Sequence, residues 1–165
     1  YVSCDYGTQN ATVFLLWCKE CSGRWVCCRE YYYSGRDEER QKTDTEYADD
    51  LERWLGGIKP VKIIIDPSAA SFIAELKKRG YAIKKAKNDV LDGIRFVASL
   101  LNQGKIAISD QCPNTIKEFG SYIWDQKASE RGEDKPVKQH DHAMDALRYF
   151  CYTIIRKPGG ISILK

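Results

Sequence analysis

The stretch VKIIIDP, residues 61–67, decides the fold class of this chain. Its isoleucine run is short and almost wholly apolar, as is typical of a central strand in a sheet that is covered on both faces. Strands and helices alternate after it. We predict strands over residues 81–85 and 105–109 and a closing helix over about residues 140–156, while residues 113–125 fit either a helix or a strand.

The first third of the chain has a different pattern. Residues 1–5, 11–18 and 24–33 are predicted to form three consecutive strands joined by short turns, as in a meander. Strict alternation along the third strand would place four of its side chains on one face: Trp25, Cys27, Tyr31 and Tyr33. A meander followed by alternating strands and helices predicts an α/β fold, in which a mixed sheet is flanked by helices.

Capping residues indicate where the helices begin and end. Thr43 and Glu46 have the spacing of a capping box, and Gly56 is expected to end the helix that they begin. Ser68 and Asn88 are predicted to cap the next two helices.

Composition restricts the function classes. The 165 residues are 43% hydrophobic and 30% charged, which indicates a globular domain. No apolar run approaches the roughly 18 residues that a membrane helix needs, so we expect no membrane span. The net charge of +3 neither demands nor excludes a nucleic-acid partner.

Seven cysteines, an odd number without a secretory leader, favour reduced thiols in a reducing compartment. Four of them cluster and raise the alternative of a zinc site: Cys18, Cys21, Cys27 and Cys28. Adjacent residues of a strand point to opposite faces, however, which argues against Cys27 and Cys28 as a zinc-binding pair. A β-hairpin whose thiols fill the core is the competing interpretation.

Two aspartates directly follow predicted strands, Asp5 after the first and Asp66 after the isoleucine run. Functional groups gather at the carboxyl ends of parallel strands, although a single aspartate there is commonly a turn former or a helix cap. If the two strands are neighbours, the carboxylates face each other and need protons or cations between them. Hard oxygen ligands favour magnesium or manganese.

The closing helix carries a third polar cluster. Asp141, His142 and Asp145 fall on one side of it, because Asp141 and His142 lie four and three residues before Asp145. The apolar stripe lies on the opposite side: Ala143, Leu147, Phe150 and Ile154. A solvated polar face explains this periodicity as well as a functional site does.

Five blocks along the chain carry a resemblance to a known family. They are VSCDYGT at 2–8, IIIDPSA at 63–69, KNDVLDGI at 87–94, RGEDKPVK at 131–138 and DHAMDALRY at 141–149. In this order and spacing they resemble the C-terminal nuclease domain of tailed-bacteriophage large terminase subunits, over nearly the whole chain.

The resemblance implies an RNase H-like fold with a metal site. Asp5, Asp66 and Asp145 match the family's metal-binding acids, and His142 matches a position that lies in the metal site of some relatives. Some relatives use an acidic pair on this helix, and Asp141 either completes such a pair or only caps the helix. We therefore expect Asp5, Asp66, Asp145 and His142 to be catalytic, with His142 and Asp141 as further candidate metal ligands. The implied cofactors are two divalent cations, Mg²⁺ or Mn²⁺, with Asp5 bridging both.

Two basic segments are candidates for binding the DNA backbone. The first holds six basic residues: Lys77, Lys78, Arg79, Lys84, Lys85 and Lys87. We expect Lys84, Lys85 and Lys87 to contact DNA, although a solvated helix end also explains such a run. The second is a predicted surface loop that carries three basic residues: Arg131, Lys135 and Lys138. A plain surface loop is the alternative there.

The resemblance also implies partners. Residues 1–157 are expected to form the nuclease domain and residues 158–165 a tail. No phosphate-binding Gly-x-x-x-x-Gly-Lys-Ser/Thr motif occurs, so the ATPase motor domain would be missing from this chain. The implied activity is cleavage of double-stranded, concatemeric DNA with little sequence specificity, in the cytoplasm of the infected bacterial host. The small terminase subunit and the portal are implied partners.

Two other functions stay open at this point. One is another RNase H-like nuclease, such as a junction resolvase or a transposase-like enzyme. The other is a non-catalytic zinc- or DNA-binding module.

Overall fold

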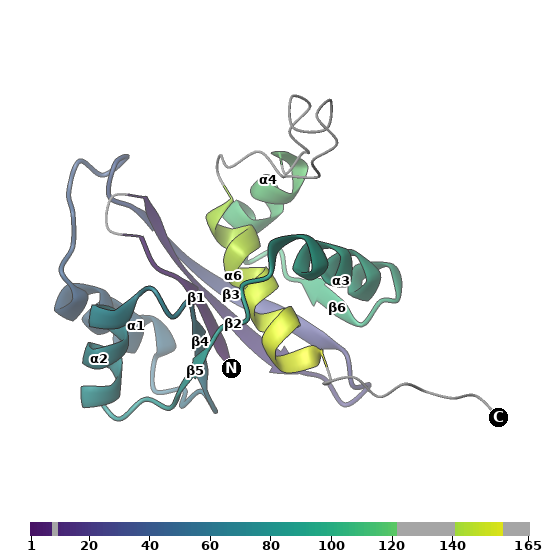
Figure 1. Ribbon diagram of the computed structural model, residues 1–165, viewed down its shortest axis with the longest axis horizontal. Helices are drawn as coiled ribbons and strands as arrows, with labels where there is room; N and C mark the ends of the chain where they lie inside the picture. The colour runs from purple at the N-terminus through teal and green to yellow at the C-terminus, as the bar shows by residue number, and fades with distance from the viewer. Residues whose placement is uncertain (8–9, 122–140, 157–165) are drawn as a thin grey trace.

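The computed structural model describes residues 1–7, 10–121 and 141–156, and in these residues six strands form one mixed sheet with helices on both faces (Figure 1). The strands are β1 (Val2–Asp5), β2 (Ala11–Lys19), β3 (Trp25–Ser34), β4 (Ile63–Ile65), β5 (Ile83–Lys85) and β6 (Ile106–Ile108). The helices are α1 (Asp44–Leu55), α2 (Ala70–Lys78), α3 (Val90–Asn102), α4 (Pro113–Ser121) and α6 (His142–Phe150), the last continuing as a π-helix over Cys151–Ile155. The predicted α/β architecture is confirmed, and the described part of the ambiguous segment, residues 113–121, is helical.

The strand order is β5-β4-β1-β2-β3-β6. Strands β1, β2 and β3 form the predicted antiparallel meander at the centre. Strands β4 and β5 continue the sheet beyond β1 in parallel, and β6 runs parallel to β3 at the opposite edge. β1 and β4 are direct neighbours. Asp5, at the end of β1, and Asp66, directly after β4, therefore lie at the same end of two adjacent strands.

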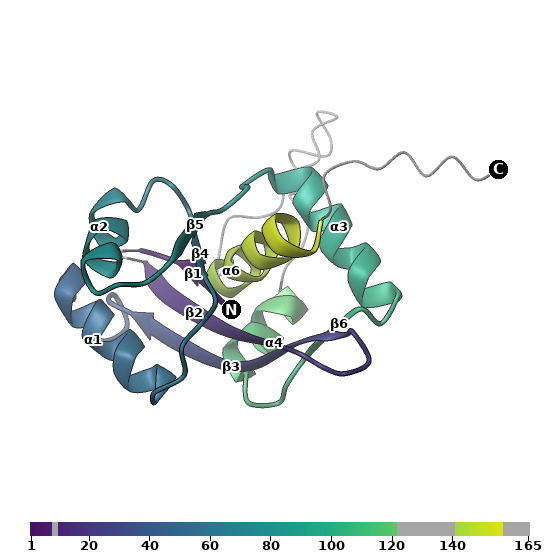
Figure 2. The ribbon, with the colours of Figure 1, turned by 90° about the horizontal axis from the view of Figure 1, so that it is seen from below.

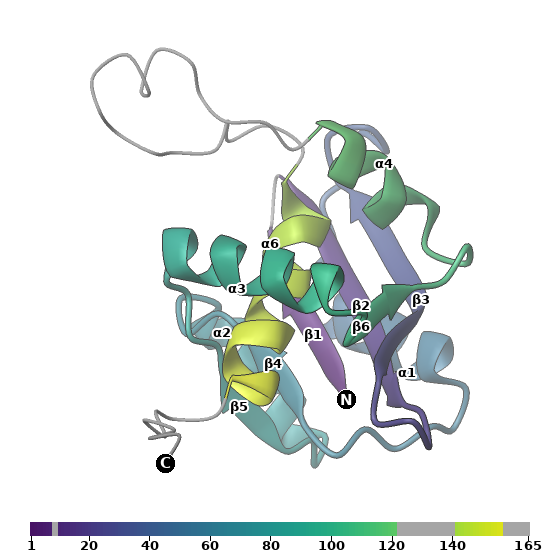
Figure 3. The same cartoon turned by 90° about the vertical axis from the view of Figure 1, so that its right-hand side faces the viewer.

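Each face of the sheet is covered by its own hydrophobic core. Along β2, Val13, Leu15 and Trp17 face α6 and α3, whereas Phe14 and Leu16 face α1 and α2. Figure 2 shows α1 and α2 on one side of the sheet and α6 with α3 on the other. Figure 3 shows α6 lying along the sheet, with α3 crossing over its outer surface. Helix α6 is therefore enclosed between the sheet and α3.

A β-bulge in β3 makes the predicted alternation wrong. Leu16 of β2 pairs with Arg29, but Trp17 pairs with Cys27, so Cys28 is an extra residue without a partner. An extra residue reverses which face every later side chain occupies. Two of the four predicted side chains, Trp25 and Cys27, consequently pack in the α6 core, whereas Tyr31 and Tyr33 pack in the α1 core.

The predicted helix caps are partly confirmed. Thr43 and Glu46 form the capping box of α1, and Gly56 ends that helix in the left-handed conformation, with φ of 58°. Ser68 and Asn88 are not caps, because α2 and α3 begin after Ala69 and Asp89, without a side-chain cap. The backbone N–H of Ser68 and the side chain of Asn88 are instead hydrogen-bonded to Asp66.

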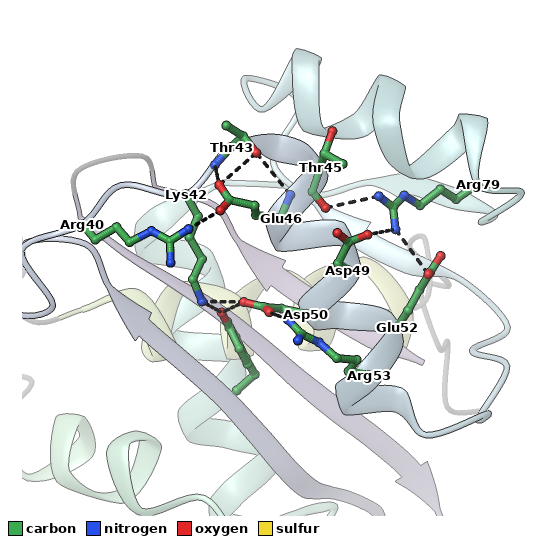
Figure 4. A network of polar contacts seen from close by, with 11 residues as sticks. Arg40, Lys42, Thr43, Thr45, Glu46, Asp49, Asp50, Glu52, Arg53 and Arg79 are labelled. Atoms are coloured by element: carbon green, nitrogen blue, oxygen red, sulfur yellow. Dashed lines mark hydrogen bonds and ion pairs between the residues drawn. The ribbon is translucent and has the colours of Figure 1, made fainter.

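A network of charged side chains joins α1 to its neighbours (Figure 4). Arg79 contacts Asp49 at 2.7 Å and Glu52 at 3.2 Å on α1, and Glu75 at 2.9 Å on α2. Asp50 forms a second, more buried centre with Lys42 and Arg53. Because its guanidinium contacts these carboxylates, Arg79 belongs to the α1–α2 contact.

No helix among the described residues is both long enough and apolar enough to span a bilayer.

Candidate metal centre

The pleat of the sheet directs Asp5 and Asp66 toward α6. Ser3 of β1 and Ile64 of β4 are paired in the parallel ladder and face the α6 side, where Ser3 Oγ accepts a hydrogen bond of 3.0 Å from Trp17 Nε1. Side chains two residues further along a strand return to the same face. Asp5 and Asp66, one residue beyond the last ladder pair, therefore end on the face that α6 covers.

Helix α6 delivers His142 and Asp145 to that strand end. His142 Nδ1 lies 3.0 Å from Asp5 Oδ2, and both side chains are largely buried, with 22% and 16% exposed. Ala143 and Ala146 are fully buried, as a close approach of the helix to the sheet requires. The polar face of α6 is only partly solvated, because His142 and Asp145 are partly exposed and the rest of α6 is buried. Asp141, just before the helix, is also partly exposed.

Electrostatic interactions show that the acidic groups share one environment. Burial raises the pKa of Asp5, and the charges of Asp145 and Asp141 raise it further, while the His142 hydrogen bond lowers it. The hydrogen bond to Asp5 raises the pKa of His142 against the opposing effect of burial. Negative charge is thus concentrated around Asp5.

Tyr149, one turn along α6 from Asp145, lies within the same field. Burial raises the pKa of its hydroxyl, and the charges of Asp5, Asp145 and Asp66 add to the effect. All three predicted acids therefore act on a single buried hydroxyl. Sequence reasoning gave Tyr149 no role beyond its place in the last block; its position four residues after Asp145 was the available signal.

Asp66 is held by hydrogen-bond donors from two loops. Its Oδ1 accepts from the Ser68 backbone N–H at 2.8 Å, and its Oδ2 accepts from Asn88 Nδ2 at 3.1 Å. Burial raises the pKa of Asp66, but hydrogen bonds from Ser68, Asn88 and Tyr149 outweigh it and the net pKa is lowered. Asp66 is thus ionised and oriented.

Asp145 is oriented by Arg148, which sequence reasoning also missed. Arg148 Nη2 donates to Asp145 Oδ1 at 2.8 Å, and Nη1 donates to the Asp89 carbonyl at 3.3 Å. Only 3% of Arg148 is exposed. Its stem passes over Gly93 of α3, where a Cβ atom would lie 2.7 Å from both Arg148 Cγ and Cδ. The absence of a side chain at position 93 makes room for the arginine.

The donor set fits a hard divalent cation. Across residues 1–7, 10–121 and 141–156, no three Asp, Glu, His or Cys side chains are close enough to hold an ion as they stand. Each carboxylate is engaged instead with a protein donor: Asp5 with His142, Asp66 with Asn88, and Asp145 with Arg148. A cation among three oxygen donors would offset the repulsion that raises the pKa of Asp5.

The four clustered cysteines do not form a zinc site. Cys27 is fully buried and its Sγ lies 3.7 Å from Cys112 Sγ, whereas Cys18 and Cys21 are exposed. Cys28 is the bulge residue. The buried-thiol interpretation holds for Cys27, whereas Cys28 is only partly buried.

The predicted DNA-binding residues fall into two groups. Lys84, Lys85 and Lys87 are exposed, on β5 and just after it. Lys85 and Ile65, the last residues of β5 and β4, are paired. Lys87 and Asp66 therefore follow their strands at the same end of the sheet. The three basic residues of the second segment, Arg131, Lys135 and Lys138, lie outside the described residues.

Comparisons with known proteins relate this chain to a family. The family model for the terminase RNase H-like domain matches residues 26–152. The large terminase subunit of Escherichia phage T5 is 32% identical over 130 residues, which are 76% of this chain and 30% of that protein. The large terminase of a thermophilic bacteriophage, solved in complex with ADP, is 56% identical with a TM-score of 0.92, over 95% of this chain and 40% of that one. The chain thus spans less than half the length of either relative.

Two more distant structures share the fold and contain metal ions. The large terminase nuclease domain of bacteriophage SPP1, with bound Mn, has a TM-score of 0.61 at 23% identity and covers 90% of this chain and 82% of that one. The large terminase nuclease of another thermophilic phage, G20c, with bound magnesium, has a TM-score of 0.66 at 16% identity, over 93% of this chain and 79% of that one.

Proposed function

The chain belongs to the terminase RNase H-like domain family, and on this premise we propose that it is a divalent-metal-dependent endonuclease that cleaves double-stranded DNA. The observation that carries the proposal is geometric: β1 and β4 are paired, so Asp5 and Asp66 end adjacent strands, and the contact of His142 with Asp5 brings the start of α6, which carries Asp145, to the same strand end. The metal ions in the two distant relatives support a divalent cation here.

Each residue has a distinct part in this proposal. Asp5, Asp66 and Asp145 would hold two Mg²⁺ or Mn²⁺ ions, with Asp5 shared between them and Asp141 as a further candidate. The ions would supply an activated water and stabilise the departing 3′ oxygen. His142 holds Asp5 through its Nδ1 atom and would orient it, and Asn88 does the same for Asp66.

Contact with the DNA backbone would come from Lys84, Lys85 and Lys87 at the edge of the sheet. Ammonium groups there would place the phosphates without reading the bases, so cleavage should show little sequence preference. The same role is proposed for Arg131, Lys135 and Lys138. Neutralising Lys84 and Lys85 should flatten the plot of log affinity against log salt concentration by about one unit per lost phosphate contact.

The biological setting follows from family membership. We propose that residues 1–157 act as the nuclease part of a longer large terminase subunit, together with an ATPase motor domain, the small subunit and the portal. Residues 158–165 would be a tail. The substrate would be concatemeric phage DNA in the cytoplasm of the infected bacterium.

The test is conversion of supercoiled plasmid to nicked and linear forms with Mg²⁺, Mn²⁺ or EDTA. Asp5→Asn and Asp145→Asn should abolish cleavage, while circular dichroism shows that they remain folded. Asp110→Asn is the matched control, because Asp110 is exposed and follows β6, at the edge of the sheet opposite β4 and β5. Cleavage that persists in EDTA, or in folded Asp5→Asn protein, would overturn the proposal.

A further inference from the structure

The start of α6 is capped by a carboxylate from another helix. Glu118 Oε2, on α4, accepts hydrogen bonds from the backbone N–H groups of Ala143 at 2.7 Å and Met144 at 3.2 Å. The residue preceding the helix, Asp141, makes no side-chain cap hydrogen bond. The first N–H groups of a helix have no partner within it, and a carboxylate is well suited to satisfy them. Glu118 therefore takes over a function that a local cap residue usually performs.

The capped residues lie between the two groups that α6 contributes to the candidate metal centre. His142 directly precedes Ala143, and Asp145 directly follows Met144. Fixing the two N–H groups between them fixes the backbone from which both side chains project. The contact of His142 Nδ1 with Asp5 Oδ2, at 3.0 Å, thus depends on where Glu118 holds the helix.

Glu118 is itself held from the sheet. Its Oε1 accepts a hydrogen bond of 2.9 Å from the Tyr32 hydroxyl on β3, and only 4% of Glu118 is exposed. Glu30, two residues before Tyr32, caps α4 by accepting hydrogen bonds from the backbone and side chain of Asn114 and of Thr115, at 2.7 to 2.9 Å. Strand β3 thus holds α4 in two places, at its first turn through Glu30 and at Glu118 through Tyr32. Glu118 in turn holds the start of α6.

A buried carboxylate is expensive unless its oxygens are hydrogen-bonded. Glu118 has donors on both oxygens, yet burial still raises its pKa against them. A local Ser or Thr cap would satisfy the same N–H groups without burying a charge. The arrangement therefore needs a reason beyond helix stability.

We propose that Glu118 is a positioning residue for the metal centre, one that sets the place of His142 and Asp145 by capping α6 from α4. This inference rests on the proposed nuclease function. It assigns no contact between Glu118 and the metal, the water or the DNA.

The experiment compares Glu118→Ala with Glu118→Gln in the whole chain. Titration calorimetry with MnCl₂ measures cation affinity, and hydrogen–deuterium exchange measures protection of residues 143–147. Loss of an outer partner of a metal ligand typically weakens metal binding by about 10- to 100-fold, and we expect that range for Glu118→Ala, with faster exchange at Ala143 and Met144. Glu118→Gln should stay within about 3-fold of the unchanged chain, because the amide oxygen can still accept both N–H groups. Glu38→Ala, at an exposed glutamate, is the control.

The outcomes separate this inference from the proposed function. Unchanged Mn²⁺ affinity in folded Glu118→Ala protein would overturn the positioning role, as would equal losses in the alanine and glutamine variants. If Glu118→Ala does not fold, Tyr32→Phe replaces it, because it removes one donor to Glu118; an unchanged Mn²⁺ affinity there would also count against the inference. If the unchanged chain neither binds Mn²⁺ nor cuts DNA, the nuclease proposal fails. In that case hydrogen–deuterium exchange still tests the cap on its own. An unchanged exchange rate at Ala143 and Met144 in Glu118→Ala would refute it.

Discussion

Replacing Gly93 by alanine tests how tightly Arg148 is packed. The new Cβ atom would lie 2.7 Å from Arg148 Cγ and Cδ, well inside the separation of about 3.5–4.0 Å at which carbon atoms attract. Arg148 is 3% exposed, and its guanidinium is bound to Asp145 and to the Asp89 carbonyl. Its stem therefore cannot move aside without disturbing those hydrogen bonds.

The expected magnitude follows from three contributions. Overpacking a core costs about 1–3 kcal/mol, and weakening a hydrogen bond to a charged group adds up to about 1.5–3 kcal/mol. Replacing glycine in a helix returns about 1 kcal/mol. We expect Gly93→Ala to lower the free energy of unfolding by about 2 kcal/mol, which corresponds to a fall in Tm of about 4–8 °C for a domain of this size.

The assay is urea unfolding followed by circular dichroism, with Gly120→Ala as the matched control. Gly120 also lies in a helix, α4, but a Cβ atom there would meet nothing within 4 Å. That variant should gain about 0.5–1 kcal/mol. The two substitutions should therefore act with opposite sign. Stabilisation of similar size by both would refute the close packing of Arg148 over α3.

Three further results are expected. Arg79→Ala should cost about 1 kcal/mol in urea unfolding and leave the salt dependence of DNA binding unchanged, whereas a flatter salt dependence would mean that Arg79 contacts phosphate. Burial raises the pKa of Asp50, but hydrogen bonds, first that from Lys42, outweigh burial and the net pKa is lowered. The ionised carboxylate therefore stabilises the fold above the unfolded pKa of about 3.9, and this stabilisation is lost as the pH falls through the folded pKa. The deficit of Asp50→Asn, about 1–3 kcal/mol at pH 7, should therefore disappear near pH 2, and an equal deficit at both pH values would argue against this reasoning. Cys18→Ser and Cys21→Ser should change neither the Tm nor the zinc content measured by elemental analysis, and stoichiometric zinc lost in either variant would restore the zinc alternative.

Much of the fold was predictable where side chains alternate regularly along a strand. The isoleucine run over residues 63–65 does lie in a parallel part of the sheet, and alternation along β2 correctly divides its side chains between two cores. Alternation failed in β3 because one extra residue, Cys28, reverses the faces. A bulge depends on how two strands are paired, and the sequence of one strand does not reveal it.

The candidate site divides in the same way. The acids at strand ends were predictable one by one, because Asp5 and Asp66 each directly follow a predicted strand, whereas the pairing of those two strands is seen only in the structure. Their partners were not: Asn88 has the features of a helix cap, but its amide turns to Asp66, 22 residues away in sequence. Glu118 carried a usable signal, since it stands three residues after Thr115 on the buried side of α4. A charged residue at a core-facing position requires a partner, and that partner is the start of α6.

The order in which the chain is made has a consequence for the site. Asp5 and Asp66 are synthesised before Asp145, and the meander β1–β3 can pair through local contacts. Asp145 comes from α6, which packs between the sheet and α3 and can take that place only after both have been synthesised. Contacts between segments so far apart form late, because closing long loops is entropically unfavourable. A nascent chain that stalls before residue 141 therefore holds two acids and lacks the third, so that cutting competence would be acquired only on completion of the fold.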